Sequence, residues 1–410
     1  MKEQEKKETA LVPRGEQALV ATEGKKDSYW GKVATRYTLA MRLFVVVLIL
    51  FVVLFMALFS RAFTYDSLFC FFKDLKMISA FVPSDYQTVT STYVEGEQTV
   101  LSYRGGIAFV NPAGVEIYSP DGRRLLDVSR ELKNPRAAAS RKYLVAYDHG
   151  GKTFTVTNSY AELFHGETEQ PIFGLAVSDS GHFALITGSD TALATVLLYD
   201  NNFNLIHRYT RASATVGVTI SGNGKWITML ELFTENGQVG TKAEMFRVGE
   251  EESELTLLFE DEMPLSVAFT NDRYFALLTD KNVRFYHING ECEGAHPLSH
   301  APVAFDVSED GAVLAMKRDA AGNSHTLIAF DKKGRVQYQT DFSGDVLSLS
   351  HTKDAFYILT PEAVHEIQIE SQEKTSVEIE RGATAIFTVD RRALRVVYSA
   401  KAAYISFADR

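Results

Sequence analysis

The stretch Val303-Ala-Phe-Asp-Val-Ser-Glu-Asp-Gly-Ala-Val-Leu-Ala-Met316 decides the fold, because most of the chain repeats its pattern. Apolar residues alternate with smaller or polar ones from Val303 to Val307, and a period of two is the signal of a β-strand. Ser308-Glu-Asp-Gly311 then supplies a tight turn, since glycine accepts a positive φ and aspartate can bond to its own backbone. A second apolar run follows. The stretch therefore predicts two strands joined by a turn.

The same unit occurs eight times, and a Ser or Thr marks the end of the first strand in each. These markers are Ser102, Ser140, Ser178, Ser221, Thr270, Ser308, Ser350 and Thr388. Successive markers lie 38 to 49 residues apart, which leaves room for four strands in each unit. A period of this length with four strands is the signature of a propeller blade.

The last unit is too short for four strands, because only 22 residues follow Thr388. Residues 86–93 lie before the first unit, alternate in polarity and belong to no other blade. Pairing them with the last blade would close the ring and remove exposed edge strands. We therefore predict an all-β, eight-bladed propeller over residues 84–410, with seven blades as the alternative if the first or last unit is not a true blade.

An apolar segment precedes the propeller. The uncharged run from Leu43 to Ser60 is built mainly of Leu, Ile, Val and Phe. As a helix it would span about 27 Å at about 1.5 Å per residue, slightly less than the hydrocarbon core of a bilayer. Arg42 and Arg61 can reach the interface from either end. We expect a transmembrane helix over residues 41–61.

The flanking charges predict the orientation of this helix. Lys25, Lys26, Lys32, Arg36 and Arg42 precede it, whereas the basic residues that follow are mixed with aspartates, so the N-terminus is expected in the cytoplasm and the propeller outside. A cleaved signal peptide is the alternative, but its leader would be too long, and we favour an uncleaved signal anchor. Residues 1–40 are then a disordered cytoplasmic tail, and residues 62–83 are a juxtamembrane connector.

The charge of the chain argues against a polyanionic partner. Residues 1–42 carry nine basic and six acidic residues, a net charge of +3, and residues 43–60 carry none. The whole chain carries −10, so residues 61–410 carry −13. An acidic propeller is poorly suited to nucleic acid. The two cysteines, Cys70 and Cys292, are expected to be unpaired.

These features together resemble a known family. The basic tail, the single apolar helix, the Phe-rich connector and the units with Ser-x-[Asp/Asn]-Gly turns are similar to a family of uncharacterised single-pass membrane proteins of Gram-positive anaerobes. The resemblance implies a propeller related to quinoprotein-like and WD40-like repeats and a location in the cell envelope. It implies no activity.

The sequence contains no motif that specifies a reaction. The turns lack the spacing and the Trp of a sialidase Asp-box, and Trp226 is the single tryptophan after residue 30. His296 and His300 are four residues apart, but they lie in a Pro-containing connector where further zinc ligands are lacking. No phosphate loop or nucleophile elbow is present. We expect no catalytic residue, cofactor or metal, and we lean against an enzyme.

The copies differ mainly in the loops opposite the repeated turns, and loops often carry function on rigid scaffolds. The longest unit has a stretched hairpin over residues 231–243, and two other units are extended at residues 188–190 and 317–325. The candidate interaction residues in these loops are Asp190, Glu231, Asn236, Gln238, Lys242, Arg318, Asp319 and His325. The sequence favours a membrane-anchored scaffold that binds an envelope protein. A propeller enzyme acting on envelope carbohydrate and a ligand sensor are the alternatives.

Overall fold

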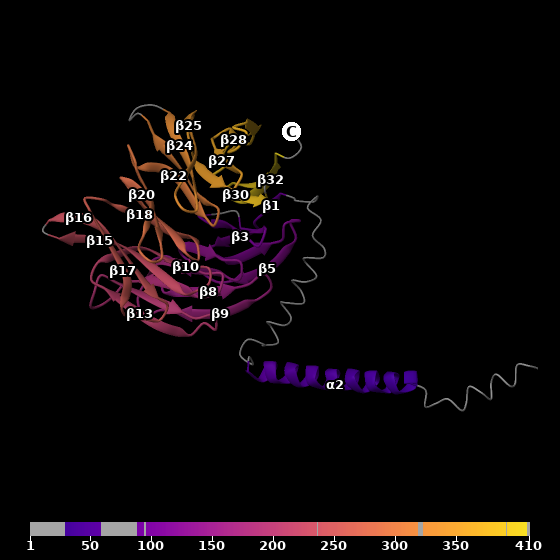
Figure 1. Cartoon of the computed structure of the whole chain (residues 1–410). Coiled ribbons are helices and arrows are strands. Elements are labelled where there is room, and N and C mark those ends of the chain that lie inside the picture. The colour runs from indigo at the N-terminus through magenta and orange to yellow at the C-terminus, as the bar shows by residue number, and fades with distance from the viewer. Residues whose placement is uncertain are drawn as a thin grey trace, which may run out of the picture. The chain divides into compact units, whose positions relative to one another are not determined.

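The computed structural model describes residues 29–58, 88–93, 96–235, 237–318, 323–390 and 392–407. The chain divides into two units, Met1–Phe81 and Val82–Arg410. Figure 1 shows the first as a helix and the second as a propeller.

The N-terminal unit contains helix α2 (Tyr29–Leu58). Its side chains from Leu43 to Phe51 are exposed. Within the part of the chain that the structure describes, no helix is both long and apolar enough to cross a membrane. Residues 59–61 of the predicted span, residues 1–28 of the predicted tail and the whole predicted connector lie outside the described residues. Residues 29–40 of the predicted tail belong to α2. Insertion of this segment into a membrane stays a prediction.

The second unit is built from eight four-stranded antiparallel sheets, which are the blades of the propeller. Blades 1 to 4 consist of β2 (Thr99–Tyr103), β3 (Gly106–Asn111), β4 (Gly114–Tyr118), β5 (Arg124–Ser129), β6 (Pro135–Ala139), β7 (Leu144–Asp148), β8 (Thr153–Thr157), β9 (Glu162–Glu167), β10 (Ile172–Val177), β11 (Phe183–Thr187), β12 (Ala194–Tyr199), β13 (Leu205–Arg211), β14 (Ala214–Ile220), β15 (Trp226–Glu235), β16 (Gln238–Arg247) and β17 (Ser253–Glu260).

Blades 5 to 7 repeat this order, and blade 8 takes its fourth strand from the start of the propeller. Their strands are β18 (Pro264–Asn271), β19 (Tyr274–Thr279), β20 (Asn282–His287), β21 (Cys292–Pro297), β22 (Pro302–Ser308), β23 (Gly311–Lys317), β24 (Ser324–Asp331), β25 (Val336–Ser343), β26 (Ser348–His351), β27 (Ala355–Leu359), β28 (Ala363–Gln368), β29 (Lys374–Glu378), β30 (Ala385–Asp390), β31 (Ala393–Val397), β32 (Lys401–Ser406) and β1 (Val89–Thr90). The prediction of an eight-bladed propeller is confirmed.

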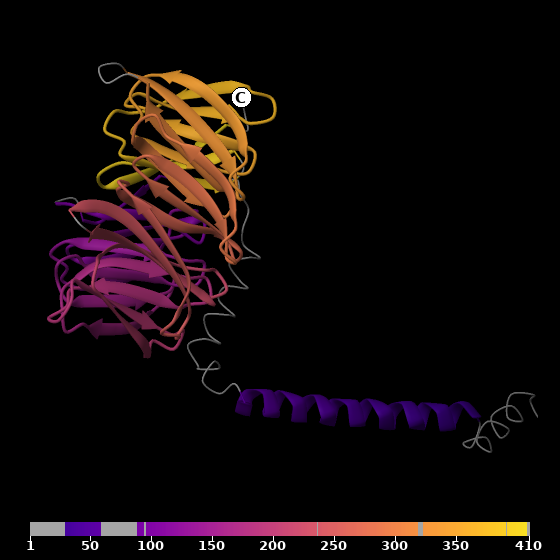
Figure 2. The same ribbon diagram turned by 60° about the vertical axis from the view of Figure 1, so that its left-hand side comes forward.

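The ring closes between the first and the last blade. β1 pairs antiparallel with β32, with Val89 opposite Ala402. The inner strand of each blade contacts the next around the ring, and β2 of blade 1 contacts β30 of blade 8. Arg395, fully buried in β31, donates a hydrogen bond of 2.7 Å to the carbonyl oxygen of Pro120 in blade 1. In Figures 1 and 2 the violet first blade accordingly lies beside the yellow last blade.

The core lies between the blades. Eight clusters of buried apolar side chains can be traced among the described residues, one for each pair of neighbouring blades. Between blades 2 and 3, for example, the ring of Phe154 in β8 packs against the rings of Phe183 and Tyr199, with centroids 5.8 and 5.5 Å apart. Both faces of most sheets are therefore covered, which explains the continuous apolar runs of second strands such as β11 and β27.

The repeated turns follow the inner strands, as the opening stretch predicts. β22 and β23 are joined by a tight turn in which Ser308 pairs with Gly311. Gly311 has a φ of 140°, and a Cβ there would lie 2.1 Å from the carbonyl oxygen of Phe330. Only glycine tolerates this position. We call the surface made by these turns, such as residues 178–181, 221–224 and 308–311, the turn face.

Candidate functional site

The opposite end of the ring is made by two sets of loops. These are the connectors between blades, such as residues 168–171, 261–263 and 344–347, and the loops between the second and third strands, such as residues 188–193 and 280–281. We call this surface the loop face. Every inner strand begins here and ends at the turn face, because the inner strands all have the same place in their blades.

The candidate residues of blade 4 lie along and at the tip of one long hairpin. β15 and β16 have ten residues each and project beyond the neighbouring blades at the left of Figure 1. Glu231 and Lys242 stand opposite each other within these strands, so neither lies in a loop. Gln238 is exposed at the tip. Asn236 lies outside the described residues.

Glu231 and Lys242 belong to a buried network of alternating charges. Glu231 is fully buried and pairs with Arg211 of blade 3, and the ammonium of Lys242 lies 3.1 Å from it. Lys242 is also 3.2 Å from Glu244, which pairs with Arg211 in turn. Two acidic and two basic groups thus neutralise each other and join blade 3 to blade 4.

The remaining candidates differ in exposure. Asp190 is exposed and accepts a hydrogen bond of 2.7 Å from the Gln170 amide. Arg318 is exposed and lies 2.6 Å from Asp341. His325 is buried in β24. Asp319 lies outside the described residues. The structure therefore places Asp190, Gln238 and Arg318 on the surface of different blades rather than in one cluster.

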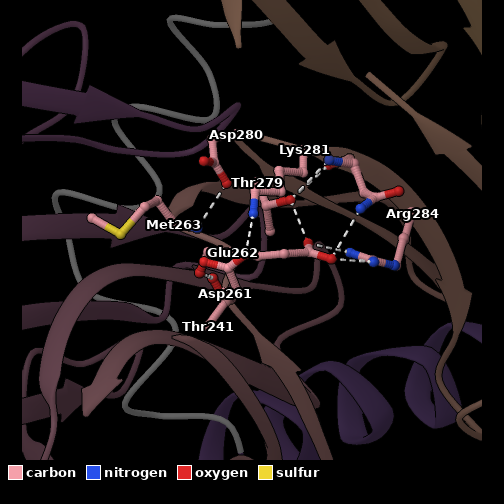
Figure 3. A network of polar contacts seen from close by, with 9 residues as sticks. Thr241, Asp261, Glu262, Met263, Thr279, Asp280, Lys281 and Arg284 are labelled. Carbon is pink, nitrogen blue, oxygen red and sulfur yellow. Dashed lines mark hydrogen bonds and ion pairs between the residues drawn. The ribbon is translucent and has the colours of Figure 1, made fainter. Parts of the chain in front are cut away.

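A second buried network, which no sequence pattern predicts, supports the connector between blades 4 and 5 (Figure 3). The guanidinium of Arg284 donates two hydrogen bonds, of 2.7 and 2.6 Å, to the two carboxylate oxygens of Glu262. Thr279 and Asn282 donate to the same carboxylate at 2.6 and 2.9 Å. The arginine also lies over the ring of Phe259, 4.1 Å from its centroid.

These contacts set the ionisation of the pair. Burial alone would raise the pKa of Glu262, but the hydrogen bonds from Arg284, Thr279 and Asn282 outweigh it and lower that pKa below its ordinary value. The hydrogen bonds with Glu262 in turn raise the pKa of Arg284. Both groups are therefore charged at neutral pH.

The network fixes the backbone that leads into β18. Thr241 donates a hydrogen bond of 2.7 Å to the carbonyl oxygen of Glu262, and the amide of Met263 donates one of 2.8 Å to Asp280. Figure 3 shows these groups around the connector. Met263 and Leu265 are thereby held at the loop face with exposed fractions of 46% and 42%.

Exposed apolar side chains lie on four consecutive inner strands, β10, β14, β18 and β22, and in the connectors that lead into β18 and β26. We call this set the apolar arc; its members are Phe173, Val216, Met263, Leu265, Val303, Phe305 and Leu347. Their strands, from β10 to β26, contact one another in sequence around the ring. Large apolar groups exposed on a rigid scaffold indicate a surface for binding a partner. In the sequence they cannot be told from core residues, because the same alternation fits both.

The turn face has a cavity of about 1180 Å³. Turns of blades 1 to 6 border it with charged side chains that include Arg141, Asp179, Asp272 and Glu309. Arg141 pairs with Glu309, although their blades are four apart in a ring of eight, and its Nε lies 3.4 Å from Asp179. The sequence predicts a structural role alone for these turns, yet they also border a space that a small molecule could enter.

A Ser–His–Asp arrangement joins blades 6 and 7. Nδ1 of His351 lies 2.8 Å from Asp306, and its Nε2 lies 3.1 Å from the hydroxyl of Ser308. The backbone amide of His351 also donates to Asp306, at 3.1 Å. The histidine side chain is 5% exposed and the aspartate 32%. Because the imidazole of His351 is buried between the blades while the carboxylate of Asp306 is partly exposed, this arrangement suits a link between blades better than catalysis.

His296 and His300 are the two histidines whose spacing was compared with that of zinc ligands. His296 lies in the outer strand β21 and not in the predicted connector, and its Nε2 is 2.7 Å from the carbonyl oxygen of Gly334 in the next blade. Across the residues that the structure describes, no group of three or more His, Cys, Asp or Glu side chains is placed to hold a metal ion.

The blades and the closing strand define an eight-bladed propeller protein with a WD40-like ring. The chain belongs to DUF5711, a family of unknown function whose model matches residues 82–407. No curated protein matches the sequence significantly.

Solved structures with a similar fold come from unrelated sequences. The C-terminal WD40 domain of Sif2 has a TM-score of 0.54 and 11% identity over 78% of this chain and 98% of that one. Sqt1 of Chaetomium thermophilum, bound to the N-terminus of the ribosomal protein L10, has a TM-score of 0.51 and 8% identity over 79% and 100%. A eukaryotic initiation factor has a TM-score of 0.51 and 13% identity over 75% and 83%. At these identities the likeness concerns the fold alone.

Proposed function

We propose that this protein is an interaction module that its N-terminal segment anchors in the cell membrane, with the propeller on the extracytoplasmic side. It would act as a scaffold in the cell envelope, as the resemblance to single-pass proteins of Gram-positive anaerobes implies. The apolar arc is the observation that supports the binding role. Seven exposed apolar side chains, five on four neighbouring inner strands and two in the connectors that lead into β18 and β26, are a poor choice for a surface that meets only water.

The rigidity of the ring supports the same role. β1 closes the last blade, and the Glu262–Arg284 network holds one connector of the loop face in a single conformation. A surface that is ordered before binding loses little conformational entropy when a partner arrives. Among proteins of similar fold, Sqt1 is seen bound to the N-terminus of the ribosomal protein L10, so such a ring can hold a terminal segment of a partner.

The anchor is supported by the sequence of residues 43–60, which carries no charge over 18 residues and is rich in Leu, Val and Phe. Basic residues before this run favour a cytoplasmic N-terminus. The acidic propeller would then lie outside the membrane.

Site-specific photocrosslinking tests the binding role. A photoreactive phenylalanine analogue replaces Phe173 or Leu347 in the apolar arc, and Val336, an equally exposed residue on the outer strand β25, serves as the matched control. Irradiation of intact cells should yield a discrete protein adduct from the two arc positions and none from Val336. Equal labelling from all three positions, or no adduct from the arc, would show that the loop face binds no protein.

An enzyme acting on envelope carbohydrate is the second candidate, and the cavity of the turn face is the observation that favours it. Three carboxylates, those of Asp179, Asp272 and Glu309, border this cavity. The purified protein should then release reducing ends from envelope polysaccharide, and Glu309→Gln should abolish the release. Equal rates for the two proteins would remove this candidate.

A further inference from the structure

The charge of the loop face is not evenly distributed. The connectors and loops that lead into and lie within blades 3 to 7 contain eight acidic and two basic residues. Glu262 is buried and paired with Arg284, so the remaining seven acidic and two basic residues carry a net charge of −5. The acidic residues are Glu169, Asp190, Asp261, Glu262, Asp280, Asp319, Asp345 and Glu362, and the basic ones are Lys281 and Arg318. The corresponding segments of blades 8, 1 and 2 contain four of each sign and are neutral.

The acidic side of the ring is also the apolar side. Every member of the apolar arc lies on blades 3 to 7 or in a connector that leads into one of them. A partner that buries the arc must therefore bring apolar groups together with positive charge, because like charges placed opposite each other oppose binding. The apolar side chains and the negative charge thus lie on the same half of the ring. Together they favour a partner that is both apolar and basic.

We propose that the apolar arc binds an extended polypeptide segment in which apolar residues are interspersed with Lys or Arg. This inference rests on the proposed interaction role and specifies the chemistry of the partner. Five adjoining strand ends form a continuous arc, which a single extended segment can follow from β10 to β26. The apolar side chains of the segment would cover the arc, while its basic side chains would face carboxylates such as those of Asp190 and Asp345.

Other occupants fit these observations less well. A surface of anionic phospholipid would be repelled by the acidic loops, and a zwitterionic one would offer them no net positive charge. Nucleic acid is disfavoured for the same reason. A second copy of this propeller would place two surfaces of charge −5 against each other. The basic and apolar segment is the occupant for which both the charge and the apolar groups are complementary.

Three fluorescent nonapeptides test the chemistry with the purified full-length protein. They alternate Lys with Leu, Glu with Leu, and Lys with Ser, and binding is followed by fluorescence anisotropy at physiological salt. The Lys–Leu peptide should bind, and the other two should bind at least tenfold more weakly. Equal binding of the Lys–Leu and Glu–Leu peptides would overturn the charge argument. Equal binding of the Lys–Leu and Lys–Ser peptides would overturn the apolar one.

Matched variants locate the site. Leu265→Ser should weaken binding of the Lys–Leu peptide about fivefold to tenfold, because a Leu side chain that is partly exposed loses its contact with the ligand. Val336→Ser, on an outer strand, should leave binding unchanged. Asp345→Lys should weaken binding several-fold, whereas Glu131→Lys, in the neutral half of the loop face, should not. Equal effects within either pair would place the peptide elsewhere.

The interaction role of the apolar arc and the proposed chemistry of its partner can be refuted separately. A partner adduct from Phe173 or Leu347 without selective binding of the Lys–Leu peptide would leave the interaction role standing and refute the proposed chemistry. An adduct with the mass of two copies of the chain would identify the occupant as a second propeller and would also refute it. Absence of any adduct from the arc would refute both.

Discussion

Replacement of Arg284 by Met should lower the free energy of unfolding, because the buried carboxylate of Glu262 is then no longer neutralised. Glu262 and Arg284 have side chains only 10% and 14% exposed, so removal of the arginine leaves a nearly buried negative charge. Loss of one partner of a buried ion pair costs about 3–5 kcal/mol. Glu262 keeps the donors Thr279 and Asn282, so we expect the lower end, about 3 kcal/mol. Methionine preserves much of the packing on Phe259.

The dependence on pH gives the prediction its sign. In the native protein the pKa of Glu262 is lowered, so the stabilisation is complete above the ordinary glutamate value and is lost as the pH falls through the lowered folded value. Without Arg284 burial dominates, and the pKa of Glu262 should lie above its ordinary value. The folded variant then binds a proton more readily than the unfolded chain, so its stability should rise relative to the native protein between pH 7 and pH 5.

Urea denaturation at pH 7 and pH 5 measures both effects, and the uncharged denaturant leaves the ion pair unscreened. The double variant Glu262→Gln/Arg284→Met should regain a large part of the loss, because no buried charge remains. A loss below about 0.5 kcal/mol at pH 7, well under the range for a broken buried pair, would refute the reasoning. A deficit for Arg284→Met that is the same at both pH values would show that the carboxylate is not its source.

Three further predictions concern other parts of the chain. Glu231→Ala should lower the free energy of unfolding by about 3–5 kcal/mol, because it removes the buried carboxylate that Arg211 and Lys242 pair with. Glu169→Ala, at an exposed pair with Arg208, should lower it by less than about 1 kcal/mol. Urea denaturation compares the two variants. Val89→Asp should detach β1 and cause association of the exposed edge of β32, seen as concentration-dependent light scattering. If the propeller is extracytoplasmic, a membrane-impermeant maleimide should label exposed Cys292 in intact cells carrying Cys70→Ser.

Each of these has an outcome that contradicts it. Equal losses for the two glutamate variants would mean that burial of the network does not matter. A monomeric Val89→Asp protein would mean that the edge is protected without β1. Labelling of Cys292 only after the cells are broken would place the propeller on the cytoplasmic side.

The architecture could be predicted because short local sequence patterns specify each blade and the same pattern is repeated along the chain. A turn such as Ser308-Glu-Asp-Gly311 needs residues with particular backbone freedom, and eight copies at similar spacing identify the blades. The donor of the missing strand follows from arithmetic on one short unit. Val89 and Thr90, which pair with β32, belong to the segment chosen for that role.

The candidate site could be predicted only in part, because its contacts join residues far apart in the sequence. Nothing near Glu262 marks it as the partner of Arg284, and only the packing of neighbouring strands brings them together. The sequence predicts Glu231 and Lys242 in a loop, because a stretched hairpin and a loop look alike in sequence, but ten-residue strands extend through that region. The exposure of Leu265 cannot be predicted from the sequence, because an apolar residue at the start of a strand is also typical of a buried core position.

The way in which the ring is closed has a mechanical consequence. Any tension that reaches the propeller through the residues before Val89 is applied first to β1, which holds blade 8 through two paired residues. Blades 1 to 7 each hold their outer strand by four or more pairs and lie behind this one in the line of force. The strand that completes the fold is thus also its weakest joint under load, and a pull on the tether would open the ring before it unfolds any blade.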